Sequence, residues 1–277
     1  MIIWLNGELV DEKRAVLSPA DRGLLLADGL FETLRAAPHG LIDLPRHVKR
    51  LELGADYFGI PLQYSQAQFD AACRAVLEVN GLAHQAASLR ITLTRGPGPR
   101  GLAPPSEPKP TVIVSANAAM KPPSALSVIT ATPRRNEKSP TSRFKTLAYT
   151  DNVLAKREAQ IAGADDAFLL NGQDRYACAS AANLWIVRNA TVTTPPVSEG
   201  ALPGIVREQL IGLAPDFNNQ VVEAPITRLE LEAADEIFMT NSLIGICAVR
   251  SVDGRKVANG KVTAQLSRVY GEAVSFD

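Results

Sequence analysis

The chain has 277 residues, with 29 lysines and arginines against 29 aspartates and glutamates, and 46% of its residues are hydrophobic. This apolar content and neutral charge balance exclude an intrinsically disordered chain, and the lack of strong compositional bias excludes a coiled coil or collagen. The charge balance also argues against a general nucleic-acid-binding protein, which presents a basic surface to phosphates. The length predicts one large domain or two domains of about 100–150 residues each.

The cysteines and histidines predict neither disulfides nor a metal site. Cys73, Cys178 and Cys247 are odd in number and widely separated, and the three histidines form no HxxH or HExxH pattern. Residues 1–10 lack the basic region of a signal peptide, and no apolar run approaches the roughly 18 residues that a membrane span needs. We therefore expect a cytoplasmic protein with no membrane or nucleic-acid partner.

The first part of the chain mixes strands and helices. A strand over 2–5 leads into the turn Asn6-Gly7. Apolar residues at helical spacing predict a helix over 44–58, with Pro45 in its first turn. The other elements expected here are a strand over 30–36, a helix over 67–79, and strands over 88–94 and 111–116.

Residues 118–124 have the composition of a linker and divide the chain into domains at 1–117 and 125–277. The second domain should contain a helix over 151–162, with Asp151 as its N-cap and Gly163 as its stop. Its other expected elements are strands over 126–132, 167–170, 184–187, 221–222 and 236–240, a short helix after Pro203-Gly204, and a closing helix over 261–273. The pattern predicts an α/β or α+β fold of two domains with a cleft between them.

Two short motifs match known signatures but lack the surroundings that those signatures need. Gly96–Gly101 fits GxGxxG, yet Pro104 and Pro105 follow where a dinucleotide-binding fold would begin a helix, so a mobile loop is the better interpretation. Ser142–Lys145 fits the SxxK of acyl-transferring serine hydrolases. That class also needs a later KTG strand, which the sequence does not contain.

Six segments of the sequence form a recognisable series: DRGLLLADGLFET at 21–33, HVKRL at 47–51, KTLAYTDNVLA at 145–155, ASAANLW at 179–185, PGIVR at 203–207 and DEIFMTNS at 235–242. In this order they resemble the segments of fold-type IV pyridoxal phosphate (PLP) enzymes, a family that includes branched-chain aminotransferases, D-amino-acid aminotransferases and 4-amino-4-deoxychorismate lyases. Their spacing matches from near residue 3 to near residue 255. The resemblance implies PLP as cofactor, a small amine or amino acid as substrate, a site in the interdomain cleft, and a homodimer.

PLP enzymes need a lysine that binds the cofactor covalently and later moves protons. The resemblance identifies Lys145 as this catalytic lysine. Without the surrounding segments, Lys145 would be interpreted as an ordinary solvated loop lysine.

The cofactor phosphate is a dianion that suits a helix N-terminus and an arginine. Gly204 should let the backbone approach closely, so that the amides of Ile205 and Val206 hold phosphate oxygens. The resemblance gives the remaining cofactor contacts to Arg50 at the phosphate, Tyr149 at the ring hydroxyl, Thr240 and Ser242 as further donors, and Asn183 as a brace for the turn.

One position departs from the family pattern. Five residues before Asn183 the family has a glutamate that pairs with the pyridine nitrogen, and this chain has Cys178. Asp174 is four residues further back and should not substitute. A neutral thiol is a weak partner for that nitrogen. Three interpretations stay open: a specialised transaminase, a lyase, or a PLP-binding protein without useful turnover.

The loop from Thr94 to Gly101 resembles the RGxGxRG loop of aminodeoxychorismate lyases, which eliminate pyruvate to give 4-aminobenzoate. Arg95 and Arg100 could meet the carboxylates of that substrate, although a solvated basic loop would look the same. Phe31 and Thr33 would line the substrate pocket by family position. The sequence therefore favours a lyase, with a branched-chain or D-amino-acid aminotransferase as the alternative.

Overall fold

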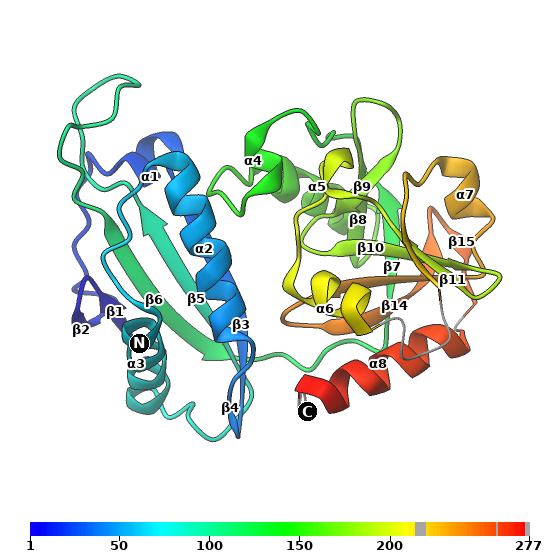
Figure 1. Cartoon of the computed structure of the whole chain (residues 1–277), viewed down its shortest axis with the longest axis horizontal. Coiled ribbons are helices and arrows are strands. Elements are labelled where there is room, and N and C mark those ends of the chain that lie inside the picture. The colour runs from blue at the N-terminus through cyan, green and yellow to red at the C-terminus, as the bar shows by residue number, and fades with distance from the viewer. Residues whose placement is uncertain (214–219, 259, 275–277) are drawn as a thin grey trace. The chain divides into compact units, whose positions relative to one another are not determined.

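The computed structural model describes residues 1–213, 220–258 and 260–274, and it forms two compact units. Unit 1 comprises Met1–Met120 and Lys145–Ala148, and unit 2 comprises Lys121–Phe144 and the described residues from Tyr149 onward (Figure 1). Each unit contains both helices and strands, which confirms the predicted fold class. Residues 145–148 group with unit 1, although the sequence analysis assigns them to the second domain.

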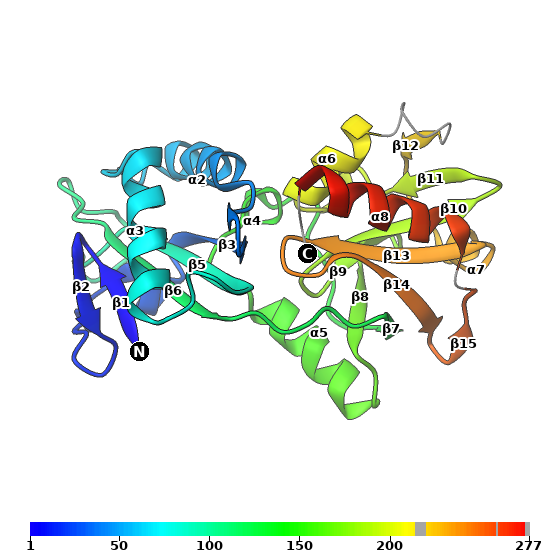
Figure 2. The same cartoon turned by 90° about the horizontal axis from the view of Figure 1, so that it is seen from below.

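Unit 1 is a six-stranded sheet with helices α2 and α3 on the same face (Figure 2). The strand order is β2-β1-β6-β5-β3-β4, and the pairs within it are antiparallel. The elements are β1 (Ile2–Leu5), β2 (Glu8–Asp11), α1 (Arg22–Leu26), β3 (Gly29–Ala37), β4 (Gly40–Leu41), α2 (Leu44–Phe58), α3 (Gln66–Val79), β5 (Ala87–Thr94) and β6 (Thr111–Ala118).

Buried and exposed side chains alternate along β5, which identifies the two faces of this sheet. Leu89, Ile91 and Leu93 are completely buried, whereas Arg90 between them is exposed. Successive side chains of a strand point to opposite faces, so the leucines and the isoleucine lie under the helices and Arg90 lies on the other face. We call that other face, with Phe31, Thr33 and Arg90, the open face of unit 1.

Unit 2 is built on a nine-stranded sheet with the path β12-β11-β10-β13-β14-β7-β8-β9, and β15 pairs with β14. Its strands are β7 (Ala125–Thr130), β8 (Asp166–Leu170), β9 (Tyr176–Ala179), β10 (Asn183–Arg188), β11 (Thr191–Thr194), β12 (Val221–Glu223), β13 (Glu236–Asn241), β14 (Gly245–Val252) and β15 (Arg255–Lys256). Its helical elements are α4 (Pro140–Arg143), α5 (Thr150–Ile161), η1 (Val197–Glu199), α6 (Ile205–Leu213), α7 (Arg228–Glu232) and α8 (Lys261–Val274).

Small side chains let α5 lie close to the sheet of unit 2. Ala155 and Ala159 of α5 are fully buried and cluster with Ala167 and Leu169 of β8. In the middle of the sheet, the rings of Trp185 and Phe238 stack with centroids 5.5 Å apart. Burial of such apolar surface is the main favourable contribution to folding.

Unit 2 differs from the sequence analysis at the start of α5 and in several elements that were not expected, among them β9, β11, β14, β15, α4 and α7. Helix α5 begins at Thr150, and Asp151 lies in its first turn instead of acting as the N-cap. Strand β14, for which the sequence analysis assigns no element, pairs with both β13 and β7. Within the described ranges, no helix is long and apolar enough to cross a membrane.

Candidate active site

Lys145 is attached to the edge of β3 by backbone pairing. The amide of Phe31 donates to the carbonyl of Lys145 (2.9 Å), and the amide of Leu147 donates to the carbonyl of Gly29 (3.0 Å). Leu30 and Thr146 form the bridge between these two bonds. This short pairing is the reason that residues 145–148 belong to unit 1.

The ring of Phe31 carries two cations on the open face. The Lys145 ammonium lies 4.3 Å from the ring centroid, and the Arg90 guanidinium carbon lies 3.9 Å from it. Thr33 is directly opposite Arg90 in the register of β3 and β5. The structure thus brings together Lys145, Phe31 and Thr33, which the sequence analysis names as site residues.

Arg90 is a member of this group that the sequence analysis missed. A signal for it was present, because an arginine between Leu89 and Ile91 in an alternating strand must lie on the face opposite the core. Arg90 also donates from Nε to the hydroxyl of Thr92 (3.1 Å). Its guanidinium is the kind of group that binds a substrate carboxylate.

Arg50 lies on the helix-covered side of β3, where it pairs with Glu32. Its Nε and Nη2 donate to the two carboxylate oxygens of Glu32 at 2.8 and 2.6 Å. Nδ1 of His47, one turn earlier on α2, lies 2.7 Å from the same carboxylate. Glu32 is completely buried, so its two oxygens fix both side chains of α2 against the strand.

The protonation of Glu32 follows from these contacts. Burial raises the pKa of the Glu32 carboxyl, and the opposing effects of Arg50 and His47 outweigh it and lower the pKa to about 2. Glu32 is therefore ionised throughout the physiological range. Its charge holds the Arg50 guanidinium in one orientation, as a bidentate carboxylate pair does.

The structure gives Arg95 a role that differs from the sequence analysis. Arg95 is buried, and its guanidinium donates to both oxygens of Asp28 and to the carbonyls of Phe58 and Gly59 at the end of α2. It therefore holds the fold together and does not present its charge to a substrate carboxylate. Arg22 also donates from its Nε to Oδ2 of Asp28 (2.8 Å), the oxygen that accepts from Nε of Arg95.

The side chain of Arg22 also holds the loop that follows Arg95. The Arg22 guanidinium donates to the carbonyls of Gly101, Leu102 and Ala103. Arg100 itself is exposed. Burial raises the pKa of the Asp28 carboxyl, and its bonds to Arg95 and Arg22 outweigh that effect and lower the pKa. Of the two arginines expected to meet a substrate here, the structure leaves Arg100 at the surface.

In unit 2, Asn183 supports the turn that begins α6. Its side-chain amide donates to the carbonyl of Leu202 (2.8 Å). A Cβ at Gly204 would lie 2.1 Å from the Asn183 Oδ1, so only glycine fits there. The first amides of a helix have no partner within the helix, and in α6 these amides belong to Ile205, Val206 and Arg207.

Thr240 and Cys178 lie on strands near this turn. Thr240 is opposite Asn183 in the register of β10 and β13, and its hydroxyl accepts a hydrogen bond from the Trp185 indole (2.9 Å). Cys178 lies on β9, which is joined to β10 by the turn in which the Ala179 amide donates to the Ala182 carbonyl (2.8 Å). Cys178, Asn183, Thr240 and the start of α6 are therefore parts of one region.

Of the other two residues expected in unit 2, Ser242 follows β13, and Tyr149 is the residue before the first turn of α5.

Cys178 is a neutral thiol in this region. It is buried, and burial raises the pKa of the thiol, against a lowering effect of Arg135. Asp174 does not take the place of a carboxylate there, because its side chain is 73% exposed and pairs with Arg134 (2.7 Å). Asp166 is the carboxylate that acts electrostatically on the thiol, and its oxygen already accepts a short bond from Ser180 (2.5 Å).

A sequence model of the family "Amino-transferase class IV" matches residues 29–252. The chain belongs to the class IV aminotransferase family. It is 36% identical to a provisionally named branched-chain-amino-acid aminotransferase of Methanocaldococcus jannaschii, over 98% of this chain and 95% of that protein. It is 29% identical to the aminodeoxychorismate lyase of Bacillus subtilis, over 99% of this chain and 94% of that protein. Further relatives, 31% and 28% identical, are a branched-chain and a D-alanine aminotransferase.

Solved structures agree with this assignment. The branched-chain aminotransferase of Thermoproteus uzoniensis with norvaline has a TM-score of 0.93 and 28% identity, covering 99% of this chain and 94% of that chain. A second solved branched-chain aminotransferase, also 28% identical and with a TM-score of 0.90, contains pyridoxamine 5'-phosphate. The match covers 99% of this chain and 93% of that chain. The protein is therefore a PLP-dependent enzyme of fold type IV.

The residues present suit this cofactor. The start of α6 offers unpartnered backbone donors beside a glycine that admits no Cβ, as a phosphate site requires. Arg50 offers a guanidinium fixed by a buried carboxylate, and Lys145 offers a primary amine.

We predict that Glu32→Gln lowers the free energy of unfolding of unit 1 at pH 7 by about 3 kcal/mol, because the Arg50 guanidinium then lacks its counter-charge. A carboxyl with a lowered pKa stabilises the fold above its unfolded pKa and loses that contribution as the pH falls. The wild type should thus lose stability between about pH 5 and pH 2, and the variant should lack this component. Urea titrations across this pH range, with hydrogen exchange of the α2 amides as the probe of unit 1, measure the loss of stability at pH 7 and its pH dependence.

The matched control for this prediction is Asp70→Asn on α3. Asp70 also pairs with an arginine, Arg74, but on an exposed surface, so its loss should change the stability by less than about 1 kcal/mol. An unchanged pH dependence in Glu32→Gln would contradict the assignment of the low pKa to this residue.

Proposed function

We propose that this PLP-dependent enzyme is an aminotransferase that moves the amino group of an apolar amino acid to an oxo acid. The observation that carries the proposal is the open-face group, in which the Lys145 amine and the Arg90 guanidinium both contact Phe31. A lysine that moves protons then lies beside a cation that can hold a substrate carboxylate and a ring that favours an apolar side chain. The named aminotransferases among the relatives support this choice.

The residues assigned to the cofactor follow the family resemblance. In unit 1, Lys145 would bind it covalently and Arg50 would hold its phosphate. In unit 2, the amides of Ile205 and Val206 would hold the phosphate next to Gly204. The remaining contacts are proposed for Tyr149, Cys178, Asn183, Thr240 and Ser242.

When bound, PLP supplies an aldehyde that condenses with amines and a conjugated ring that withdraws electrons. Lys145 would hold the cofactor through its Nζ, and the same amine, when free, would take the proton from the amine-bearing carbon of the substrate and carry it during the transfer. Arg90 binds the substrate carboxylate and keeps that carbon within reach of Nζ. Phe31 excludes water from the space around the ammonium.

A lyase acting on 4-amino-4-deoxychorismate is the second candidate. The relative from Bacillus subtilis and the loop Gly96–Gly101 support it. In that reaction Lys145 would remove the same proton, and pyruvate would leave without a second substrate. The case is weaker than the sequence indicates, because Arg95 is committed to Asp28 and Arg100 alone could meet the substrate from this loop.

We also propose that two copies of the chain form a homodimer through α1. Leu24, Leu25 and Leu26 are consecutive and exposed, and Val16 and Leu102 in the same unit are more than 80% exposed. Contiguous exposed apolar side chains on a soluble protein typically mark an interface. A second copy of the chain would cover them, as the family resemblance implies.

Covalent trapping tests the enzyme assignment. After borohydride reduction of the holoenzyme, we expect a pyridoxyl group on the peptide that contains Lys145, detected by mass spectrometry. Lys145→Ala should lack the label and lose at least about 100-fold in activity, because no other group moves the proton. Lys138→Ala, an exposed lysine seven residues earlier, is the control and should retain both.

The substrates separate the candidates. We expect glutamate to form from leucine and 2-oxoglutarate, with D-alanine assayed in parallel for stereochemistry. Release of 4-aminobenzoate from aminodeoxychorismate, without amino transfer, would replace the aminotransferase by the lyase. A labelled Lys145 with neither activity would leave a PLP-binding protein without turnover, and an unlabelled one would remove the site assignment.

Cys178→Glu tests the departure from the family pattern. Because the buried thiol carries no negative charge, a carboxylate in its place should raise kcat for amino transfer by about tenfold or more. Cys178→Ala, which is also neutral, should stay close to the wild type. If Cys178→Glu binds PLP and folds normally but does not gain activity, the thiol is a functional adaptation and not a loss.

For the dimer, we expect Leu24→Glu to shift the protein from dimer to monomer in sedimentation experiments, because a buried unpaired charge disfavours the interface. Ile161→Glu, which alters an equally exposed apolar residue at the end of α5, should leave the dimer intact. A wild-type protein that sediments as a monomer would refute the homodimer.

A further inference from the structure

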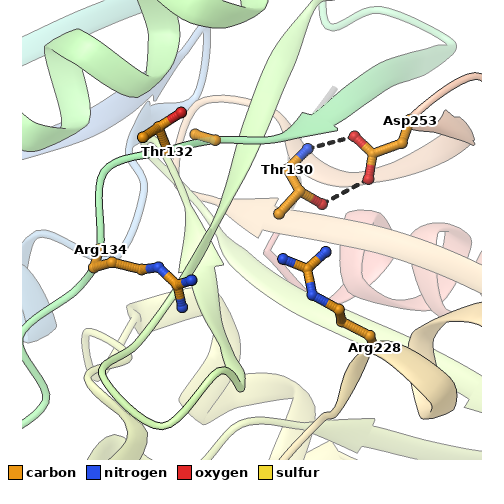
Figure 3. Close-up of a pocket in the computed structure, with 6 residues that line it drawn as sticks. Thr130, Thr132, Arg134, Arg228 and Asp253 are labelled. Carbon is orange, nitrogen blue, oxygen red and sulfur yellow. Dashed lines mark hydrogen bonds between the residues drawn. The ribbon is translucent and has the colours of Figure 1, made fainter.

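Unit 2 contains a cavity that is lined by none of the residues assigned to the reaction. It has a volume of about 470 Å³ and is lined by Thr130, Ala131, Thr132, Arg134, Arg228 and Asp253. Figure 3 shows the guanidinium groups of Arg134 and Arg228 reaching toward the same hollow from two different segments. The volume is within the range of small-molecule sites.

Arg134 is already neutralised at the edge of this cavity. Its Nη1 lies 2.7 Å from a carboxylate oxygen of Asp174 and donates to the carbonyl of Asn171 (3.0 Å). These contacts hold the guanidinium in place. They leave Arg228 and Asp253 as the two remaining charged groups of the lining.

Asp253 is held in a fixed position by Thr130. One carboxylate oxygen accepts from the Thr130 amide and the other from its hydroxyl, both at 2.7 Å. The hydroxyl of Thr130 is also 2.9 Å from that of Tyr176, which is buried. A carboxylate has about four acceptor sites, so Asp253 can still accept from a ligand.

Within the described ranges, the Arg228 side chain forms no hydrogen bond or ion pair, although Asp253 lines the same cavity. An opposite pair that shares a hollow without touching leaves both groups unneutralised at short range. A ligand with both charges would satisfy each group at once. A simple anion would satisfy Arg228 but would be repelled by Asp253.

We propose that this cavity binds a small zwitterion with a carboxylate and a protonated amine, as in an α-amino acid. The ligand carboxylate pairs with Arg228, next to the anchored guanidinium of Arg134, and its ammonium donates to Asp253. None of the residues that line this cavity belongs to the open-face group, and the proposal does not depend on which reaction the enzyme catalyses.

The test uses N,N-dimethylglycine and the holoenzyme. This zwitterion keeps an N–H donor, but as a tertiary amine it cannot condense with an aldehyde, so it reports binding without entering the reaction. Saturation-transfer NMR of its methyl signal gives the Kd at constant ionic strength. We expect acetate, which lacks the ammonium, to bind at least tenfold more weakly.

Two variants assign the binding to this cavity. Arg228→Gln and Asp253→Asn should each weaken N,N-dimethylglycine at least tenfold, and Arg228→Gln should leave the catalytic activity unchanged. Arg157→Gln, an exposed arginine on α5, is the matched control and should bind as the wild type does. The proposal is overturned if acetate binds as tightly as the zwitterion, if Arg228→Gln has no effect, or if binding does not saturate.

Discussion

Two backbone hydrogen bonds at the edge of β3 bring Lys145 to the sheet of unit 1, and the proposed chemistry depends on them. They join Phe31 to Lys145 and Gly29 to Leu147, segments that are distant in the sequence. Because backbone pairing fixes both the register and the face, the lysine and Phe31 meet in one arrangement, with Arg90 held on the same ring by the neighbouring strand. A free loop would not hold an amine with this accuracy, so the pairing positions the reacting group before any ligand binds.

Two carboxylates, the buried Glu32 and the partly buried Asp28, fix the orientation of three arginines of unit 1. Asp28 takes up Arg22 and Arg95, and these two side chains in turn fix the end of α2 and the loop after β5. Glu32 takes up Arg50 in the same way, but it does so on the helix-covered side of the strand. Such pairs add orientation more than stability, since desolvation offsets much of the attraction. Arg90 instead contacts the hydroxyl of Thr92 and the ring of Phe31 on the open face.

The sequence predicts elements well where a local rule sets their limits. Pro45 and Gly59 bound α2 at the predicted residues, and Gly163 follows α5. The rules fail where partners are distant in sequence. Strand β14 is a central strand buried between two others, so it lacks the alternation that identifies a half-exposed strand. Arg95 lies in a motif that resembles a substrate loop, and only the distant Asp28 and the end of α2 show that it is structural. Arg90 combines both situations. The alternation of β5 predicts the face of the sheet on which Arg90 lies, but its position beside Lys145 depends on a segment distant in the sequence.

In the proposed site, the thiol of Cys178 limits what the other residues can do. At neutral pH it stays protonated, because burial raises its pKa. The two carboxylates that could compensate are committed elsewhere, Asp174 to Arg134 at the surface and Asp166 to Ser180. Among the residues proposed for the site, those of unit 2 offer backbone dipoles and neutral groups near the start of α6, and those of unit 1 that carry a full charge are Lys145, Arg90 and Arg50. If no carboxylate pairs with the pyridine nitrogen of PLP, the ring withdraws electrons less strongly. The reaction rate then depends more strongly on how well Lys145 is placed. The effect of Cys178→Glu should consequently be largest for substrates that Arg90 binds poorly.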